Sequence, residues 1–155
     1  MQEETRMLRG VRSVASIGGH PLHPMLIPFP IAFLVGALAT DVAFASTRDL
    51  FWARVSLWLL GAGVLTGLAS AVLGLIDFVA LRRVRSTAAG WVHFLGNVAA
   101  IGLALANWLL RTGNHERHLL PWGITLSALT TAMLIVTGWL GGELSYRHGI
   151  GVHPR

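Results

Sequence analysis

Four long apolar runs, separated by short polar segments, dominate the hydrophobic pattern of the chain. Each has at least about the twenty residues that a helix needs to cross the hydrocarbon core of a bilayer. The runs cover residues 25–45, 51–81, 88–110 and 120–144. The pattern predicts an all-α fold, an integral membrane four-helix bundle whose transmembrane domain occupies residues 18–155.

A polar, arginine-bearing segment, residues 1–17, precedes the first run. Its apolar residues recur among the arginines at a spacing that fits a short amphipathic helix lying on the membrane surface. A charged tail without helical structure fits equally well. The segment lacks the apolar core of a signal peptide, so we expect no cleaved leader.

Composition agrees with a lipid environment. The chain is 54% hydrophobic and 12% charged, which leaves too little polar surface to solvate a globule. All twelve basic residues are arginines, and eleven of them lie outside the apolar runs, so they indicate membrane topology and not a nucleic-acid surface. The chain has no cysteine, which excludes disulfides and thiolate metal sites.

The distribution of arginines predicts the orientation. Four spans place both termini on one side of the membrane, and that side carries eight of the twelve arginines. The positive-inside rule therefore predicts cytoplasmic termini and a multi-pass protein of the inner (plasma) membrane. The arginines on the side of the termini are Arg6, Arg9, Arg12, Arg82, Arg83, Arg85, Arg147 and Arg155; those on the other side are Arg48, Arg54, Arg111 and Arg117.

Histidines and acids gather at the predicted cytoplasmic end. His20 and His23 each precede a proline just before the first run, which favours extended backbone with both rings on one side. The other three spans contribute further ionisable residues there: Asp77, His93, Glu143 and His148. Such groups are costly at the membrane unless they are paired or bound, so they predict a functional site.

Imidazoles suggest the chemistry of this site. Imidazole is the commonest metal ligand, and two imidazoles from facing helices can hold a haem iron. We therefore predict haem b or a transition metal ion at this end. The candidate cofactor ligands are His20, His23, His93 and His148, and Asp77 and Glu143 are further candidate metal ligands or carboxylates that orient the imidazoles.

Each residue also has a purely structural explanation. A His-Pro pair can cap a helix, and His93 can be a buried histidine that is hydrogen-bonded to Asn97 or to a carbonyl. Asp41, with Arg48, Asp49 and Arg54 nearby, is interpreted as part of a salt-bridged interfacial cluster. The remaining acids can form ion pairs within their own helices, Asp77 with Arg82 and Glu143 with Arg147.

The two halves of the chain resemble each other weakly. Each pair of spans begins with histidine and ends with an acid followed by arginine: His20 and His23, then Asp77 and Arg82, against His93, then Glu143 and Arg147. This suggests two hairpins related by an axis along the membrane normal.

Three segments carry a family resemblance: Gly19–Pro24 leading into Phe29-Pro30, Gly90–Asn97, and Gly142–Val152. They make the chain similar to domain of unknown function family 2231, bacterial four-span membrane proteins. The resemblance implies a small inner-membrane protein. Because some relatives are joined to Rieske-type or cytochrome-type domains, it also implies such a redox partner or a larger membrane complex. His20, His23, His93 and His148 match the motif positions, but no catalytic role comes with them.

Electron transfer through bound haem or metal is the leading functional hypothesis. A non-catalytic structural or assembly subunit of a membrane complex is the alternative, and a small proton or solute carrier with Asp77, His93 and Glu143 as a relay is a third. We recognise no nucleophile–base–orienter set, so we predict no catalytic residue. A homo-oligomer is compatible with the sequence.

Overall fold

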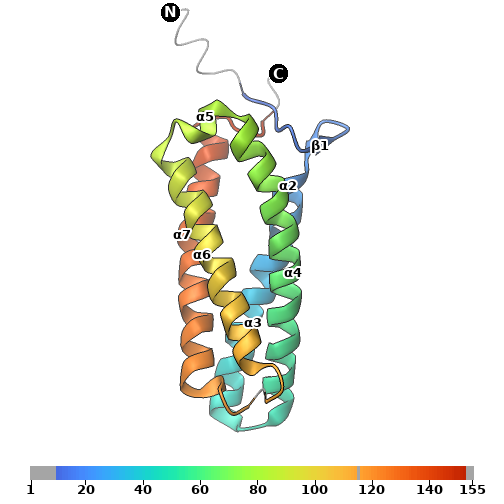
Figure 1. Cartoon of the computed structure of the whole chain (residues 1–155), viewed down its shortest axis with the longest axis vertical. Coiled ribbons are helices and arrows are strands. Elements are labelled where there is room, and N and C mark those ends of the chain that lie inside the picture. Colours follow the sequence, from blue (N-terminus) through green and yellow to red (C-terminus); the bar gives the residue numbers. More distant parts are fainter. Residues whose placement is uncertain (1–9, 115, 153–155) are drawn as a thin grey trace, which may run out of the picture.

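The computed structural model describes residues 10–114 and 116–152. Four long antiparallel helices form the molecule (Figure 1), and each is long and apolar enough to cross a membrane. They are α3 (Pro28–Thr47), α4 (Leu50–Ala80), α6 (Ala88–Arg111) and α7 (Ile124–Tyr146). The predicted all-α membrane bundle is therefore confirmed.

Short elements precede or connect the long helices. A two-stranded hairpin and one short helix lead into α3: β1 (Ser16–Ile17), β2 (His20–Pro21) and α2 (Leu22–Leu26). The short helix α5 (Arg82–Arg85) joins α4 to α6, and the π-helix η1 (Leu119–Gly123) leads into α7.

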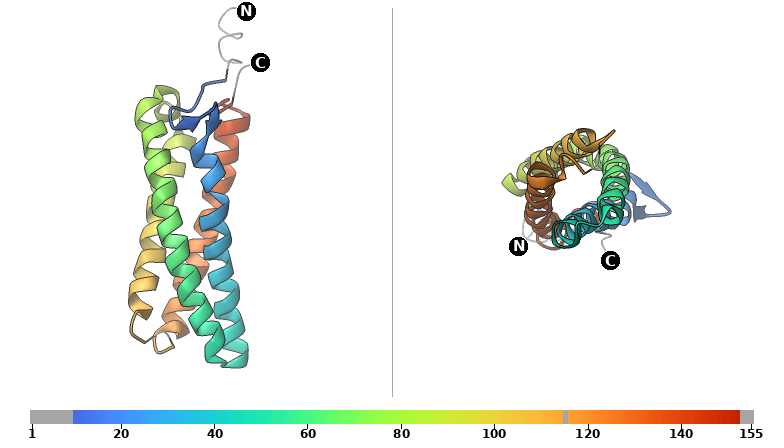
Figure 2. Two further views of the ribbon diagram at one scale, coloured as in Figure 1. Left: turned by 90° about the vertical axis from the view of Figure 1, so that its right-hand side faces the viewer. Right: turned by 90° about the horizontal axis from the view of Figure 1, so that it is seen from below.

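Seen along its axis, the bundle is a ring of helices in the order α3, α4, α6, α7 (Figure 2). Hairpins α3–α4 and α6–α7 thus pack side by side, and α3 lies diagonally opposite α6. The ribbons of α4 and α6 diverge towards the end that carries α5 (Figure 1). We call this end, where His23 and His93 lie, the histidine end. The opposite end, where Asp41 and Arg111 lie, is the ion-pair end.

Aliphatic side chains seal the middle of the bundle. The buried residues there are Leu34, Ala37, Leu60, Val64, Ala100, Ala104 and Leu134. Gly63 permits the close approach of α3 and α4, because a Cβ at this position would lie 2.6 Å from Cδ2 of Leu34. The outer surface is apolar as well: Trp58 is 80% exposed and Trp139 is 79% exposed. Lipid is the solvent in which such a surface is stable.

The described part of the N-terminal segment, from Gly10 to Ile17, is extended and not helical. Its backbone pairs with the C-terminal part of the chain, where Val11 forms a parallel bridge with Ile150. Tertiary hydrogen bonds thus take the place of a surface helix over these residues. Residues 1–9 lie outside the described part of the chain.

Candidate functional site

Two histidines from different hairpins meet inside the bundle at the histidine end. His23 is the second residue of α2, and His93 lies in the second turn of α6. Their ring centroids are 6.3 Å apart and their planes are nearly perpendicular, at 89°. α2 leads into α3, which lies opposite α6 (Figure 2). The contact between the two rings therefore connects diagonally opposed parts of the bundle. Both side chains are only partly buried.

A backbone carbonyl anchors each ring. Nδ1 of His23 lies 2.8 Å from the carbonyl oxygen of Ser70, and Nδ1 of His93 lies 2.8 Å from that of Thr137. A carbonyl oxygen only accepts hydrogen bonds, so each Nδ1 must carry the proton. In the neutral rings Nε2 then keeps its lone pair. This is the tautomer and the type of support that metal-binding histidines use.

Glycines make room for the rings against the neighbouring helices. Gly74 lies four residues, about one turn, after Ser70, and Gly141 lies four residues after Thr137. A Cβ at Gly74 would lie 2.8 Å from Cε1 of the His23 ring, and a Cβ at Gly141 would lie 3.0 Å from Cε1 of the His93 ring. Each imidazole therefore rests directly on the backbone of α4 or α7.

The two halves of the site repeat each other along the sequence. His93 follows His23 by 70 positions, and the carbonyl and glycine that support His93 follow their counterparts by 67. The resemblance between the hairpins thus has a structural basis in the histidines. It does not extend to the acids, because an offset of 67 matches Asp77 with Leu144 and not with Glu143.

Polar side chains border the histidine pair. Asn97 donates to the backbone oxygen of His93 over 2.7 Å and accepts from the hydroxyl of Thr137 over 3.2 Å. The bonds that were expected for His93 therefore occur, the carbonyl at its ring and Asn97 at its backbone. Ser70 is only 5% exposed, and its hydroxyl has no hydrogen-bond partner among the described residues.

A second cross-bundle pair occupies the ion-pair end. Arg111 binds the carboxylate of Asp41 through two parallel hydrogen bonds of 2.7 Å, and both side chains are 0% exposed. The prediction that Asp41 pairs within an interfacial cluster of its sequence neighbours is wrong. Arg48 and Arg54 are exposed, and Asp49 caps the N-terminus of α4. The partner of Asp41 comes from α6 because of the way the helices are arranged in the bundle. It is not one of the neighbours of Asp41 in the sequence.

Polar neighbours saturate this buried pair. Asp41 also accepts from the hydroxyls of Ser56 and Ser127, and Arg111 donates through Nε to the side-chain oxygen of Asn107. With further bonds to both serines, every N–H of the guanidinium has an acceptor. A buried pair is stable in this form because no charge or lone pair is left without a partner. Arg111 falls just beyond the third apolar run, so the hydrophobic pattern does not predict this network. The 70-residue offset of Arg111 from Asp41, the same as that of the histidines, is the signal that could have revealed it.

Comparison with known proteins identifies the chain at the level of the family. Residues 19–154 match the family described as predicted membrane protein (DUF2231). The chain belongs to the DUF2231 family. No curated protein and no solved structure matches it. Both histidines of the pair and both members of the ion pair lie within the matched part of this DUF2231 protein.

The acids proposed as metal ligands have other partners. Asp77 accepts hydrogen bonds from Ser13 and from the backbone of Val14, and among the described contacts it forms no ion pair with Arg82. Glu143 forms the expected ion pair with Arg147 one turn away, over 3.2 Å, and Arg147 is largely exposed. In this DUF2231 protein the two acids at the histidine end, Asp77 and Glu143, therefore form hydrogen bonds or ion pairs with residues other than the two histidines.

The other two candidate histidines stand apart from the pair. His20 is exposed in β2, and His148 is partly buried just beyond α7. The extended backbone predicted for His20 is present, but the same prediction for His23 is wrong. Pro24 lies in the first turn of α2, where a missing backbone N–H costs little, so the helix can include both residues.

The count of ligands limits the kinds of cofactor that fit. In the described part of this DUF2231 protein, no group of three or more histidines, cysteines, aspartates or glutamates is placed so that it could hold a metal ion. The site offers two imidazoles. That is half of the four ligands that a bare zinc ion takes from protein or water.

Proposed function

We propose that His23 and His93 would hold one haem b, and that the protein is a membrane electron carrier. The separation of the two rings supports this best. Two metal–nitrogen bonds of about 2 Å and two centroid-to-nitrogen distances of about 1.1 Å put the centroids of opposed imidazoles roughly 6 Å apart. The observed separation is 6.3 Å.

The number of protein ligands favours haem over a bare metal ion. A porphyrin supplies four equatorial nitrogens, so the protein has to supply only the axial ones. His23 and His93 meet that requirement, and their carbonyl partners hold both rings in the tautomer with a free Nε2. When bound, haem iron exchanges single electrons.

The surroundings of the histidines are less fully buried than the opposite end of the bundle. His23, His93 and Asn97 are partly exposed at the histidine end. At the ion-pair end the corresponding interior residues Asp41, Asn107 and Arg111 are 0% exposed. Within the described part of the chain, the histidine end therefore combines candidate ligands with partly exposed side chains.

The spacing of the two pairs supports a position of the proposed cofactor near one membrane face. Asp41 follows His23 by 18 positions, and Arg111 follows His93 by the same number. Eighteen helical residues span about 27 Å, close to the thickness of the hydrocarbon core. The aliphatic middle of the bundle lies between the two pairs. We therefore propose that electrons enter and leave at the histidine end.

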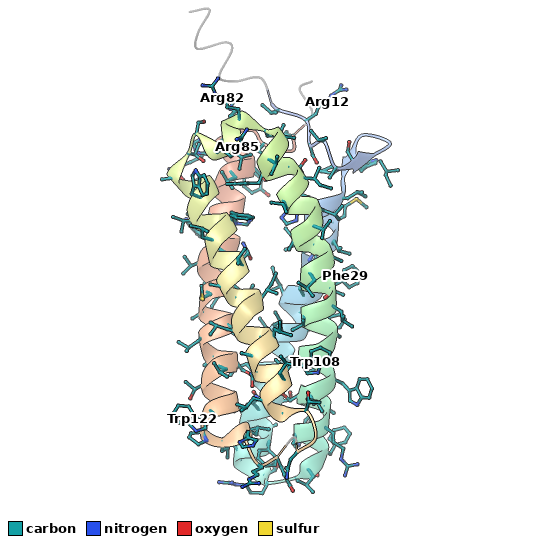
Figure 3. All side chains as sticks on the ribbon, in the orientation of Figure 1. Arg12, Phe29, Arg82, Arg85, Trp108 and Trp122 are labelled. Carbon is teal, nitrogen blue, oxygen red and sulfur yellow. The ribbon has the colours of Figure 1, made fainter. Side chains whose placement is uncertain are left out.

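Arginines support a cytoplasmic location for this end. Arg12, Arg82 and Arg85 lie there (Figure 3), as do Arg83 and Arg147. Described arginines beyond the ion-pair end are Arg48, Arg54 and Arg117. By the positive-inside rule we propose a bacterial inner-membrane protein whose histidine end faces the cytoplasm. A Rieske-type or cytochrome-type protein remains the proposed redox partner, supported by the family resemblance alone.

Purification from haem-replete membranes tests the proposal. We expect one haem b per chain in the wild type and loss of bound haem in His23→Ala and His93→Ala. His20→Ala is the matched control, since His20 also precedes a proline but is exposed in β2. A colourless wild-type protein, or equal loss of haem in all three variants, would refute the haem site and favour the structural or assembly subunit.

A further inference from the structure

An extended segment crosses the histidine end before the first helix. We call residues 10–21 the strap (Figure 1). Its start pairs with the C-terminal part of the chain: Val11 donates to the carbonyl of Gly149 over 2.8 Å and accepts from Gly151 over 2.8 Å. Its end, β2, runs directly into α2 and His23.

Asp77 fastens the middle of the strap to α4. Its carboxylate accepts from the hydroxyl of Ser13 over 2.6 Å, from the amide of Val14 over 2.7 Å and from the amide of Ala15 over 3.1 Å. Three donors converge on one carboxylate in the last turn of α4. Hydrogen bonds to a charged acceptor are about twice as strong as neutral ones, so this is the strongest side-chain anchor of the strap.

The fastened residues connect directly to the start of α2. The carbonyl of Ala15 accepts from the amide of Leu22, the first residue of α2, over 2.9 Å. Between them, β1 and β2 pair through a turn at Gly18 and Gly19, both of which have positive φ. Pro21, the N-cap, has no side chain that can accept a hydrogen bond. The strap therefore defines where α2 begins.

The two histidines consequently differ in how their backbone is held. His93 lies within a 24-residue helix whose N-terminus is capped by the Thr87 hydroxyl, which accepts from Gly90 over 3.0 Å. His23 lies in the first turn of α2, which continues through Ile27 into α3. The N-cap of α2 forms no side-chain hydrogen bond, so this first turn relies on the bond from the amide of Leu22 to Ala15 of the strap.

We infer that Asp77 is a positioning residue for His23: by fastening the strap, it holds this histidine in reach of the ligand that it shares with His93. The inference rests on the proposed function. It assigns to Asp77 a role in keeping one axial ligand in place, with no contact to the cofactor. Loss of the anchor affects His23 alone and leaves His93 in position.

Asp77→Asn tests this assignment in two states of the protein. Without haem, we expect hydrogen–deuterium exchange of peptides covering residues 13–22 to rise about tenfold, because asparagine lacks the negative charge that strengthens all three bonds and its amide nitrogen cannot accept from Ser13. With haem, we expect the low-spin spectrum of a six-coordinate iron to change partly to high-spin, as one axial ligand is lost. Ser13→Ala removes one of the three bonds and should shift both readouts in the same direction by less.

Glu143→Gln is the matched control, because this acid lies at the same end but pairs only with the exposed Arg147 in the described contacts. It should leave exchange and spectrum unchanged. A wild-type low-spin spectrum that Asp77→Asn and Ser13→Ala both retain would overturn the role of Asp77 while leaving the haem site intact. Absence of haem from the wild type would instead refute the proposed function, and the exchange data on the strap would still test the anchor.

Discussion

Arg111 donates two parallel hydrogen bonds to Asp41 across the bundle, and neither side chain is exposed to solvent or lipid. The two residues are 70 positions apart, as are His23 and His93. The same 70-residue offset thus produces two cross-bundle pairs, one between α2 and α6 and one between α3 and α6. One is a closed ion pair with every bond satisfied, and the other is a pair of imidazoles with free Nε2 atoms.

The ion pair predicts a specific stability pattern. Arg111→Met leaves the Asp41 carboxylate buried without its counter-ion, so we expect a loss of about 3–5 kcal/mol in the free energy of unfolding. The double variant Asp41→Leu, Arg111→Met removes both charges and should recover much of that loss. Thermal unfolding in detergent measures both.

Arg147→Met is the control for this series. It removes an exposed ion pair to Glu143 and should change stability by less than about 1 kcal/mol. A double variant that is less stable than Arg111→Met alone would contradict the account of a neutralising buried pair.

Glycines beside the histidines provide a second prediction. In Gly74→Ala the new methyl group overlaps the ring of His23, whose contact would be 2.8 Å, so the ring must move away from α4. We expect haem retention to fall about tenfold. Gly141→Ala, with a closest contact of 3.0 Å, should have a smaller effect.

Gly138→Ala serves as the comparison, because a Cβ at this position meets nothing within 4 Å. It should leave haem binding unchanged and raise helix stability slightly. Equal behaviour of Gly74→Ala and Gly138→Ala would show that the rings do not depend on the glycine contacts.

Packing between α3 and α4 gives a third prediction. Gly63→Ala places a methyl group 2.6 Å from Cδ2 of Leu34 in the sealed middle of the bundle. Overpacking of this kind costs about 1–3 kcal/mol. The melting temperature should fall, whereas Gly102→Ala, which meets nothing within 4 Å, should not lower it. An unchanged melting temperature in Gly63→Ala would contradict the close packing of α3 against α4 at this contact.

Much of the architecture could be predicted from the sequence, and the partners of polar side chains could not. Apolar run length determines a membrane span by itself, so all four spans were recognisable. The partners of Asp41 and Asp77 depend on which helices are diagonal neighbours and on how an extended strap folds back. Those are tertiary relationships. Sequence proximity instead suggested Arg48 or Arg54 as the partner of Asp41, and Arg82 as the partner of Asp77.

The histidine pair was predictable from the sequence only in part. His23 and His93 stood out as ionisable residues at one predicted end, which the topology alone could suggest. Their selection over His20 and His148 could not be predicted. It depends on Pro24 being accommodated within a helix and on carbonyls of α4 and α7 lying beside the rings.

Orientation in the membrane can be tested with single cysteines, because the chain has none of its own. Ser86 is exposed at the histidine end and Asn114 is exposed at the ion-pair end. In intact cells an impermeant maleimide should label Asn114→Cys and not Ser86→Cys, and both should react after lysis. Labelling of Ser86→Cys alone would reverse the proposed orientation.

Electron paramagnetic resonance of the oxidised, purified protein tests the central claim most directly. With axial imidazoles whose planes are perpendicular, as the rings of His23 and His93 are at 89°, we predict a low-spin haem signal of strong anisotropy. The signal should be absent from His23→Ala and from His93→Ala and present in His20→Ala. A wild-type protein with no haem signal, or with a low-spin signal that survives the loss of either histidine, would contradict the account.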